Sequence, residues 1–597
     1  MKRPKEAFII GSIILLSLVL NAFGIYYALP HVINHDEARV VYSTMNIMKT
    51  GDVFLNNFIY PGGVFYLMLL VFLLTYLVSR LSGGLFTRMP DISAISRRDW
   101  SPFIKTGRIF TACTGALTVF MTYLIGKRYF NERTALFGAF TLAVSPLFVS
   151  QSHTILPNIP TLFMIVCALY YISDMKDDSA GTLLSAGLLA GLTIGIKYNA
   201  VVVLLSALFS ACLSFRPRQW PRSWGIIIVG SLAGFFALNF SLLKNFPTFL
   251  GNISYLYQAY QVNLGSVSTF PRSNGVFYTK FLVFEDLGAG IFVLFLFGLV
   301  KSLFKSTRPQ KVIAFFTVTY LVAIGVSRAK LSRHALFLYP FIAIYCGSGC
   351  DWVIGWLSRT GKRSVYVLGT VVVCAVVFFH PVKKALTADL NLLRPDTRNI
   401  ANEWMIKNIP EGASMLIEDW YLRPYEEGGC ADTVPVDPAR YDVDYFRGHM
   451  IMPWDLYQRE YLVVWSFNSS EDEISEIKKY INPRKRFPRF KLKASGPNIT
   501  IYNVTPPNMS FYKWVYSKDI AFIKDNGCTF HCLKKKFDGV RLDRDEASFE
   551  IKADLPSGEY LLVFLAQDAS VDKLTNKMIE MRTGTQEIGR ASCRERV

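Results

Sequence analysis

The feature that most constrains this chain is a series of apolar runs, each close to the length that crosses a lipid bilayer. Of the 597 residues, 51% are hydrophobic and only 18% are charged, which is too apolar for an ordinary soluble protein of this size. The sequence therefore predicts a mainly α, polytopic membrane protein. The clearest runs cover residues 7–30, 109–126, 225–243, 291–300, 312–326 and 365–379.

The chain becomes polar from about Asp396 onward, so we predict a membrane part at residues 1–394 and an extracytoplasmic domain at residues 395–586. The second part is expected to be α+β or β-rich. Residues 587–597, EIGRASCRERV, look like the translation of a sequencing adapter and are not expected to be part of the domain. The expected elements are a helix at 397–408 and strands at 414–417, 461–465, 499–502 and 560–564.

The positions of Lys and Arg predict the topology, because cytoplasmic loops of membrane proteins are enriched in both. Three cations precede the first apolar run, which places the N-terminus in the cytoplasm and the C-terminal domain outside. The run at residues 64–78 is interpreted as dipping into or lying along the outer leaflet, inside a long first outer loop at residues 31–105. About 11 spans follow from this, and a count of 12 or 13 stays open. The other basic clusters that fit this scheme cover residues 127–133, 216–222, 301–311 and 359–363.

The net charge of +19 does not indicate nucleic-acid binding. Basic residues lie at the ends of apolar runs and are not gathered on one face, so the expected partner is the bilayer.

An acidic cluster follows the first apolar run, where His35, Asp36 and Glu37 form the sequence HDEA. A carboxylate at a membrane surface can take a proton from a hydroxyl that attacks an activated carbon, so Asp36 is a candidate base. The plain alternative is that these charges mark the solvated end of a helix.

Two further clusters lie inside apolar surroundings. His153 and Asn158, in QSHTILPNIPTLF, predict a shaped turn at the outer surface, although a simple helix connection has the same composition. Lys197 and Tyr198, in GLTIGIKYNA, predict a break between two short helices in the run from 181 to 215. An ammonium there suggests a phosphate partner, and snorkelling to the surface is the alternative.

A fourth cluster is a basic loop that the topology places outside, against the usual charge bias. Arg328, Lys330, Arg333 and His334 form it, and an anionic lipid head or a phosphate would explain its position. No HExxH, Walker or dinucleotide glycine motif is present, so we expect no cofactor, and no motif supports a divalent cation.

Taken in order, these segments resemble the GT-C-fold glycosyltransferase superfamily, which includes dolichyl-phosphate-mannose protein mannosyltransferases and aminoarabinose transferases. The resemblance covers roughly residues 7–380. It includes the DE pair, YPGGVFYL, GRIFTACTGALTVFMTYLIGKRYF, SHTILPNIPTLF, GLTIGIKYNA and SRHALFLYPFIAIY.

The resemblance implies a membrane enzyme that moves a sugar from a polyprenyl-phosphate carrier to a protein, lipid or glycan acceptor. It implies Asp36 as the catalytic base, with Glu37 beside it to orient the acceptor or the sugar, and a carrier phosphate that meets Lys197 and Arg333. Many members carry Asp where this chain has Asn158. The substrate-binding candidates are His35, Tyr60, His153, Asn158, Lys197, Tyr198, Arg333 and His334.

Two other functions fit parts of the pattern. A transporter or flippase of lipid-linked glycans would also use an intramembrane Lys and outer cations. A catalytically inactive relative that binds glycan would explain the missing acid at Asn158.

Overall fold

The computed structural model describes nearly all of the first 418 residues and shorter stretches after them. Arg328, the side chain of His35 and parts of the predicted first loop (residues 31–33 and 82–100) lie outside the described residues, as does most of 587–597. The described ranges are 2–29, 34–81, 101–261, 274–304, 306–327, 329–359, 362–418, 440–446, 456, 459–465, 481–487, 499–505, 520–522, 531–532, 535–536, 548–549, 551–553, 558–567, 574–583 and 591–592.

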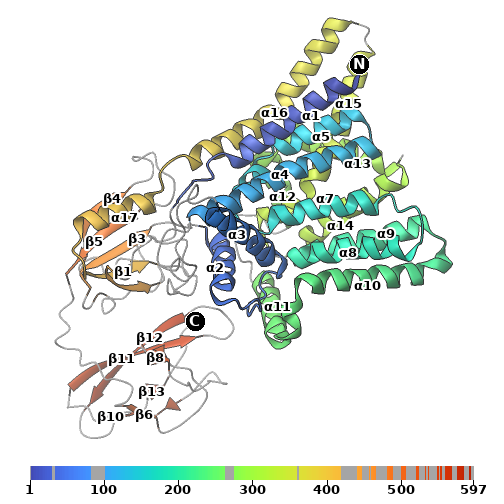
Figure 1. The fold of residues 1–597 in the computed structure, drawn as a ribbon. Helices are drawn as coiled ribbons and strands as arrows, with labels where there is room; N and C mark the ends of the chain where they lie inside the picture. Colours follow the sequence, from blue (N-terminus) through green and yellow to red (C-terminus); the bar gives the residue numbers. More distant parts are fainter. Residues whose placement is uncertain are drawn as a thin grey trace. The chain divides into compact units, whose positions relative to one another are not determined.

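The first part of the chain is helical, as predicted. Helices α4, α7, α8 and α10 run side by side, and α2 and α11 run across their direction (Figure 1). The α-helices of this part are α1 (Lys2–Ala22), α2 (His35–Thr50), α3 (Gly63–Leu81), α4 (Ser101–Tyr129), α5 (Glu132–Ala143), α6 (Pro146–Ser152), α7 (Asn158–Ile172), α8 (Ala180–Ile196), α9 (Val202–Ser214), α10 (Trp220–Leu238), α11 (Phe246–Gln261), α12 (Asn274–Lys280), α13 (Ala289–Phe304), α14 (Arg308–Val326), α15 (Tyr339–Ser358) and α16 (Arg363–Leu392). The short helices are η2 (Tyr198–Val201), η3 (Pro217–Gln219), η4 (Phe240–Leu243), the π-helix η5 (Phe281–Asp286) and η6 (Ser332–Leu338).

Seven helices within the described residues are long and apolar enough to cross a membrane. The number rises to eight if the bent pair of α5 and α6, with an angle of 60°, counts as one broken span. Four shorter apolar helices accompany them: α7, α8, α13, and η2 together with α9. The protein is therefore polytopic, and the predicted count of about 11 spans stays a prediction.

The described part of the predicted first outer loop is largely helical. It contains α2 and α3 and reaches the start of α4, and its assignment as one outer loop stays a prediction. Asp36 and Glu37 consequently lie in the first turn of a helix. Because α3 is continuous over 19 residues and strongly apolar, it meets the requirement for a span, which the counts of 12 or 13 assume.

The break predicted near Lys197 is present. Helix α8 ends at Ile196, Lys197 has extended backbone angles, and η2 and α9 follow. A buried ammonium is costly among lipid-like side chains, and the break lets it reach polar partners instead of facing apolar neighbours.

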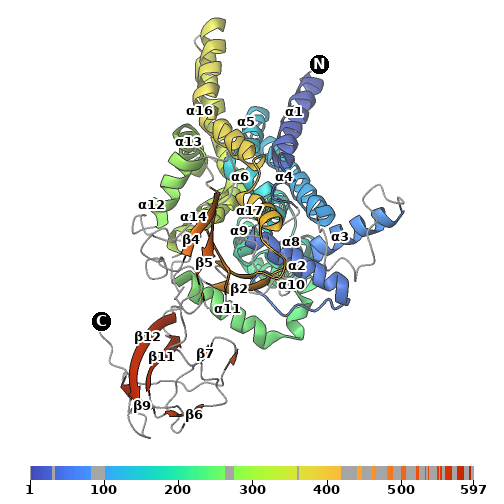
Figure 2. The ribbon, with the colours of Figure 1, turned by 90° about the vertical axis from the view of Figure 1, so that its left-hand side faces the viewer.

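Helices α8 and α10 approach closely because each has glycines four residues apart on the shared face. A Cβ added at Gly187 would lie 2.1 Å from the Ile227 carbonyl oxygen, and one at Gly191 would lie 2.0 Å from that of Ser231. Gly230 and Gly234 form the matching pair on α10. Small residues at this spacing allow helix backbones to pack in a membrane, where no hydrophobic effect drives association. Figure 2 looks nearly along these helices.

Basic residues of two of the predicted clusters lie at one end of the helical bundle, near the N-terminal helix. Lys127 at the end of α4 pairs with Glu6 on α1 at 2.6 Å. Asp174 after α7 pairs with Arg128 at 2.6 Å and lies 3.8 Å from Arg308 at the start of α14. Arg108, nearer the start of α4, lies about 28 Å from Lys127 along the helix, at a rise of about 1.5 Å per residue.

The C-terminal part begins with α17 (Thr397–Asn408), and the predicted helix and strands are present there. One sheet has five strands in the order β2-β1-β3-β5-β4, with β1 and β2 parallel and Ser414 opposite Asp442. The strands are β1 (Ser414–Glu418), β2 (Asp442–Phe446), β3 (Tyr461–Trp465), β4 (Ile481–Phe487), β5 (Ile499–Val504), β6 (Ile520–Phe522), β7 (His531–Cys532), β8 (Lys535–Lys536), β9 (Ser548–Phe549), β10 (Ile551–Ala553), β11 (Gly558–Gln567), β12 (Leu574–Thr583) and β13 (Ala591–Ser592).

The chain divides into two compact units. The first holds Met1–Met450, Val463–Ser470 and Pro483–Ile501, so it includes every α-helix among the described residues. In the second, β11 and β12 form an antiparallel pair. The predicted division at residue 394 stays a prediction.

Candidate functional site

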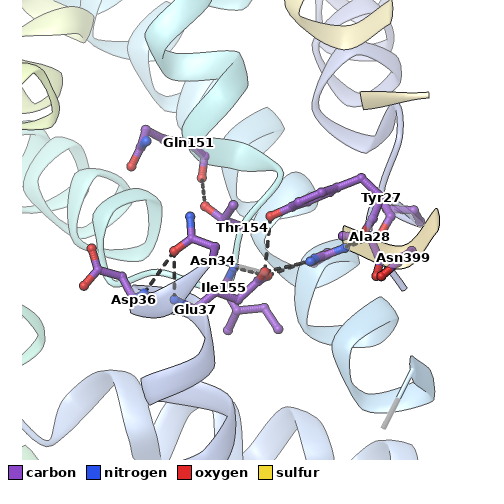
Figure 3. Close-up of polar contacts among 11 residues, drawn as sticks. Tyr27, Ala28, Asn34, Asp36, Glu37, Gln151, Thr154, Ile155 and Asn399 are labelled. Carbon is purple, nitrogen blue, oxygen red and sulfur yellow. Dashed lines mark hydrogen bonds and ion pairs between the residues drawn. The ribbon is translucent and has the colours of Figure 1, made fainter. Parts of the chain in front are cut away.

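The site begins at the N-terminus of α2, which Asn34 caps. The Asn34 side-chain oxygen accepts hydrogen bonds from the backbone N–H groups of Asp36 at 3.0 Å and Glu37 at 3.2 Å (Figure 3). An Asn cap satisfies donors that have no partner within the helix, and acids in the first turn are favoured by the helix dipole. The sequence NHDEA thus fixes two neighbouring carboxylates on a rigid helix start.

The two carboxylates point in different directions, because consecutive residues of an α-helix are about 100° apart. Figure 3 shows the Asp36 and Glu37 side chains on opposite sides of the helix start. The Glu37 side chain is 0% exposed and that of Asp36 is 21% exposed. The chemical roles open to the two acids therefore differ.

Glu37 forms a buried ion pair with Arg108 of α4. Arg108 donates from Nε to Glu37 Oε1 at 2.9 Å and from Nη2 to Oε2 at 2.7 Å, and both side chains are fully buried. The backbone N–H of Ile155 and the hydroxyl of Tyr27 donate to the same carboxylate, at 3.0 and 3.2 Å. We name Glu37, Arg108, Tyr27 and Ile155 the Glu37 clamp. It leaves no carboxylate oxygen exposed to a substrate.

Asp36 is surrounded by side chains from other segments. Arg333 of η6 donates to its Oδ2, and the Tyr60 hydroxyl donates to its Oδ1 at 3.0 Å. Arg39, one turn further along α2, lies over the Tyr60 ring at 5.9 Å and acts electrostatically on Asp36. Three segments far apart in the sequence thus meet at one carboxylate.

Lys197 extends this arrangement from the break after α8. Its ammonium donates to Asn158 Oδ1 at 2.5 Å, and Asn158 in turn donates to Gln151 Oε1 at 2.5 Å. The charges of Lys197, Arg333 and Asp36 interact. We name Asp36, Tyr60, Arg333, Lys197 and Asn158 the Asp36 cluster.

The surroundings shift the pKa values of two groups in this cluster. Burial raises the pKa of Asp36, but the Arg333 and Arg39 charges and the Tyr60 hydrogen bond outweigh burial, so the pKa lies below its usual range. Burial and the neighbouring Asp36 charge raise the pKa of Tyr60. Asp36 is consequently an ionised acceptor and Tyr60 a neutral donor at neutral pH.

Three other predicted site residues contact protein groups. His153 Nε2 lies 2.9 Å from the Leu20 carbonyl oxygen and 3.5 Å from Asp389, in a buried position between α1 and α16. Tyr198 donates to the Phe58 carbonyl at 3.0 Å and so supports the segment that carries Tyr60. His334 is buried in η6, next to Arg333. The side chain of His35 lies outside the described residues.

Sequence reasoning missed Arg108 and Arg39. Arg108 directly precedes the apolar run at 109–126, and a buried Arg next to such a run needs a partner, so the signal was present. Arg39 carried no signal beyond its position one helical turn after Asp36. Across the described residues, no group of three His, Cys, Asp or Glu side chains could hold a metal ion.

These features define a polytopic membrane protein in which Asp36, a partly exposed carboxylate, lies among cations at the start of α2. A family model described as dolichyl-phosphate-mannose-protein mannosyltransferase matches residues 104–240. No curated protein matches the sequence as a relative.

Two solved structures share the fold. The oligosaccharyltransferase of Archaeoglobus fulgidus matches with a TM-score of 0.50 and 11% identity, over 85% of this chain and 75% of its own. ArnT from Cupriavidus metallidurans, solved with undecaprenyl phosphate, matches with a TM-score of 0.50 and 16% identity, over 84% and 98%. At these identities the likeness concerns the fold. The chain is therefore similar in fold to these two glycosyltransferases, and residues 104–240 also match the mannosyltransferase family model.

Proposed function

We propose that the chain is a glycosyltransferase that moves a sugar from a polyprenyl-phosphate carrier to an acceptor hydroxyl on a protein, lipid or glycan. Asp36 acts as the base, and the reaction takes place on the extracytoplasmic side. The orientation is supported by Lys127 and Arg128, which lie near the N-terminal helix at the other end of α4 and fit the cytoplasm.

The observation that carries the proposal is the charge of the Asp36 cluster. Arg333, Arg39 and Lys197 surround one ionised carboxylate, which leaves an excess of positive charge at a partly exposed position. An excess of cations within a membrane protein calls for an anionic ligand, and Arg is well suited to phosphate. The family match to dolichyl-phosphate-mannose-dependent transferases and the undecaprenyl phosphate on ArnT support a lipid-linked phosphate.

The chemistry needs one base and several cations. Asp36 takes the proton of the acceptor hydroxyl while that oxygen forms a bond to the anomeric carbon. The bond from that carbon to the phosphate oxygen breaks, and the electron pair leaves with the phosphate. A phosphodiester thereby becomes a phosphate monoester with more negative charge, which Arg333 and Lys197 stabilise in place.

Arg333 links donor binding to the strength of the base. Without donor, its guanidinium is bound to Asp36 and lowers the carboxylate pKa, which makes Asp36 a weak base. A donor phosphate draws part of that charge to itself. Asp36 then binds a proton more readily at the moment when the acceptor must be deprotonated.

The reaction as proposed uses no metal ion. The Glu37 carboxylate is already paired with Arg108 and is not available as a metal ligand. The neighbouring position that could supply a second carboxylate ligand is occupied by Asn158, which binds Lys197. Asp36 alone offers too few oxygen ligands for a divalent cation, which prefers six or more. Cations of the protein take that role instead.

The test is transfer of radiolabelled sugar from a panel of polyprenyl-phosphate donors by purified full-length protein, with EDTA present in one arm. Asp36→Asn is expected to lower turnover by about 100- to 10,000-fold, the usual contribution of a general base. Asp52→Asn is the matched control, because Asp52 is an exposed acid after α2 whose oxygen accepts only a local backbone bond from Phe54.

Full activity of Asp36→Asn would refute the proposed base. Saturable binding of the lipid without any turnover would instead favour the transporter, to which the broken helix at Lys197 also points. Loss of activity in EDTA would refute the metal-free mechanism.

A further inference from the structure

The segment between α1 and α2 is held in an unfavourable backbone conformation. Ala28 has φ of 63° and is the one residue other than glycine with positive φ within the described ranges. A side chain with a Cβ avoids this left-handed region, so contacts around Ala28 must hold it there.

The contact comes from the first turn of α17, the helix that begins the C-terminal part. Asn399 donates from its side-chain amide to the Ala28 carbonyl at 3.0 Å, and Figure 3 shows the two residues together. Gly24 in the same segment packs against the end of α16, since a Cβ there would lie 2.8 Å from Leu392 Cβ. The α16–α17 junction thus braces residues 24–28 from one side.

The Glu37 clamp holds the same segment from the other side. Arg108 donates to the carbonyls of Ile25 at 2.8 Å and Tyr27 at 2.9 Å. Its guanidinium lies 3.9 Å from the centre of the Tyr27 ring, and the Tyr27 hydroxyl binds Glu37. The backbone that Asn399 fixes is therefore the backbone that shapes the clamp.

We propose that Asn399 is a positioning residue that sets the location of Asp36 through Ala28, Tyr27 and Glu37. The first helix of the C-terminal part is then a component of the transferase site, although it contributes no group to the reaction. The part of this inference that concerns turnover rests on the proposed function, whereas the mechanical coupling does not.

Asn399→Leu separates positioning from global stability. It removes the bond to Ala28, but it also removes the Asn399 side-chain oxygen, which is buried without a hydrogen-bond partner. Losing a contact and losing an unsatisfied oxygen have opposite effects on stability. The matched control is Asn408→Leu at the end of the same helix, because Asn408 is exposed and its amide bonds only the Trp404 carbonyl.

The first readout is hydrogen–deuterium exchange of purified full-length protein. Asn399→Leu is expected to raise the exchange rates of the Asp36, Glu37 and Ile155 amides about tenfold, the change expected from losing one hydrogen bond. Asn408→Leu should leave those rates unchanged. Unchanged rates in folded Asn399→Leu would overturn the coupling, whatever the activity.

The second readout is steady-state transfer. Turnover of Asn399→Leu is expected to fall about tenfold with an unchanged donor KM, because the displaced group acts in the transition state. The loss should shrink in an Ala28→Asn background, since Asn adopts positive φ more readily. Faster exchange with wild-type turnover would overturn the positioning role. Absence of turnover in the wild type would refute the proposed function, and the exchange rates would still decide the coupling.

Discussion

Two neighbouring acids of one helix start build two different regions. Glu37 lies in a fully buried clamp in which each oxygen has protein partners. Asp36 lies in a partly exposed cluster whose cations outnumber it. The cap by Asn34 and the turn of the helix separate the two side chains. The DE pair is therefore a structural acid next to a chemically available one, and not two equivalent site residues.

The clamp and the cluster differ in what they require of a partner. A buried charge without its counter-ion is strongly destabilising, because no water replaces the lost partner. A partly exposed ion pair contributes little to stability, so its residues are free to serve a ligand. Substitutions in the clamp should thus affect folding, and substitutions in the cluster should affect catalysis.

The largest expected effect is that of Arg108→Met. It leaves Glu37 charged and buried, and the free energy of unfolding should fall by about 3–5 kcal/mol. Denaturant unfolding of purified protein measures this. The double variant Glu37→Gln with Arg108→Met should recover most of the loss, because no charge is then stranded.

The matched control for that experiment is Arg128→Met, which breaks a partly exposed pair with Asp174 at the other end of α4. Its cost should be about 0–1 kcal/mol. Equal stability of the Arg108 and Arg128 variants would break the distinction between a structural clamp and an ordinary ion pair.

The next largest effect concerns the cations of the cluster. Arg333→Met and Lys197→Met should each weaken donor binding by about 10- to 100-fold, as expected for a charge-assisted hydrogen bond worth about 1.5–3 kcal/mol. Binding of the lipid donor in detergent gives the affinity, and denaturant unfolding should show little change.

Lys244→Met serves as the control for the cluster cations. Lys244 lies over the Phe54 ring at 4.4 Å, near the segment that carries Tyr60, and it is not among the side chains that act on Asp36. If Lys244→Met weakens donor binding as much as Lys197→Met does, donor affinity depends on the overall positive charge of this end of the helical bundle and not on the Asp36 cluster.

Tyr60→Phe tests the protonation state of Asp36. The Tyr60 hydrogen bond is one of the causes that hold the Asp36 pKa below its usual range, so its loss raises that pKa. A base works only above its pKa, and the acid limb of the pH–rate profile should therefore move to higher pH. The rate at neutral pH should fall by at most about tenfold, for one neutral hydrogen bond.

The control for this profile is Tyr66→Phe, because the Tyr66 hydroxyl bonds Ser241 and the Val53 carbonyl and makes no hydrogen bond to Asp36. Its acid limb should match that of the wild type. A shift of the Tyr60→Phe limb to lower pH would show that Asp36 is not the titrating base.

Much of the fold followed from the sequence because the bilayer restricts what an apolar run can form. The helix break at Lys197 and the helix at 397–408 were predicted from a misplaced charge and from periodicity. The helix α2 around Asp36 was not predicted, because this short polar helix has no apolar stripe long enough to indicate it. Its cap, Asn34, is a signal that local reading could have used.

The site was less predictable, because its contacts join residues far apart in the chain. The ion pair of Arg333 with Asp36 spans 297 positions, and that of Arg108 with Glu37 spans 71. A local sequence pattern cannot predict ion-pair partners that are this far apart in the chain. The same limit hid the division of labour in the DE pair, since the burial of Glu37 depends on where α4 and the turn before α7 pack.

Asn34→Ala has the smallest expected effect and bears on both regions together. Its side chain accepts from the Asp36 and Glu37 amides, so its loss should lower the free energy of unfolding by about 1 kcal/mol, the usual cost of a lost N-cap. Turnover should fall as well, because the start of α2 sets the direction of Asp36. Asn34→Asp keeps an acceptor oxygen and is the matched control, expected to retain both properties. A variant Asn34→Ala that loses stability but keeps full turnover would show that the cluster holds Asp36 in place without the helix start, and the two regions would then be independent in spite of their adjacent residues.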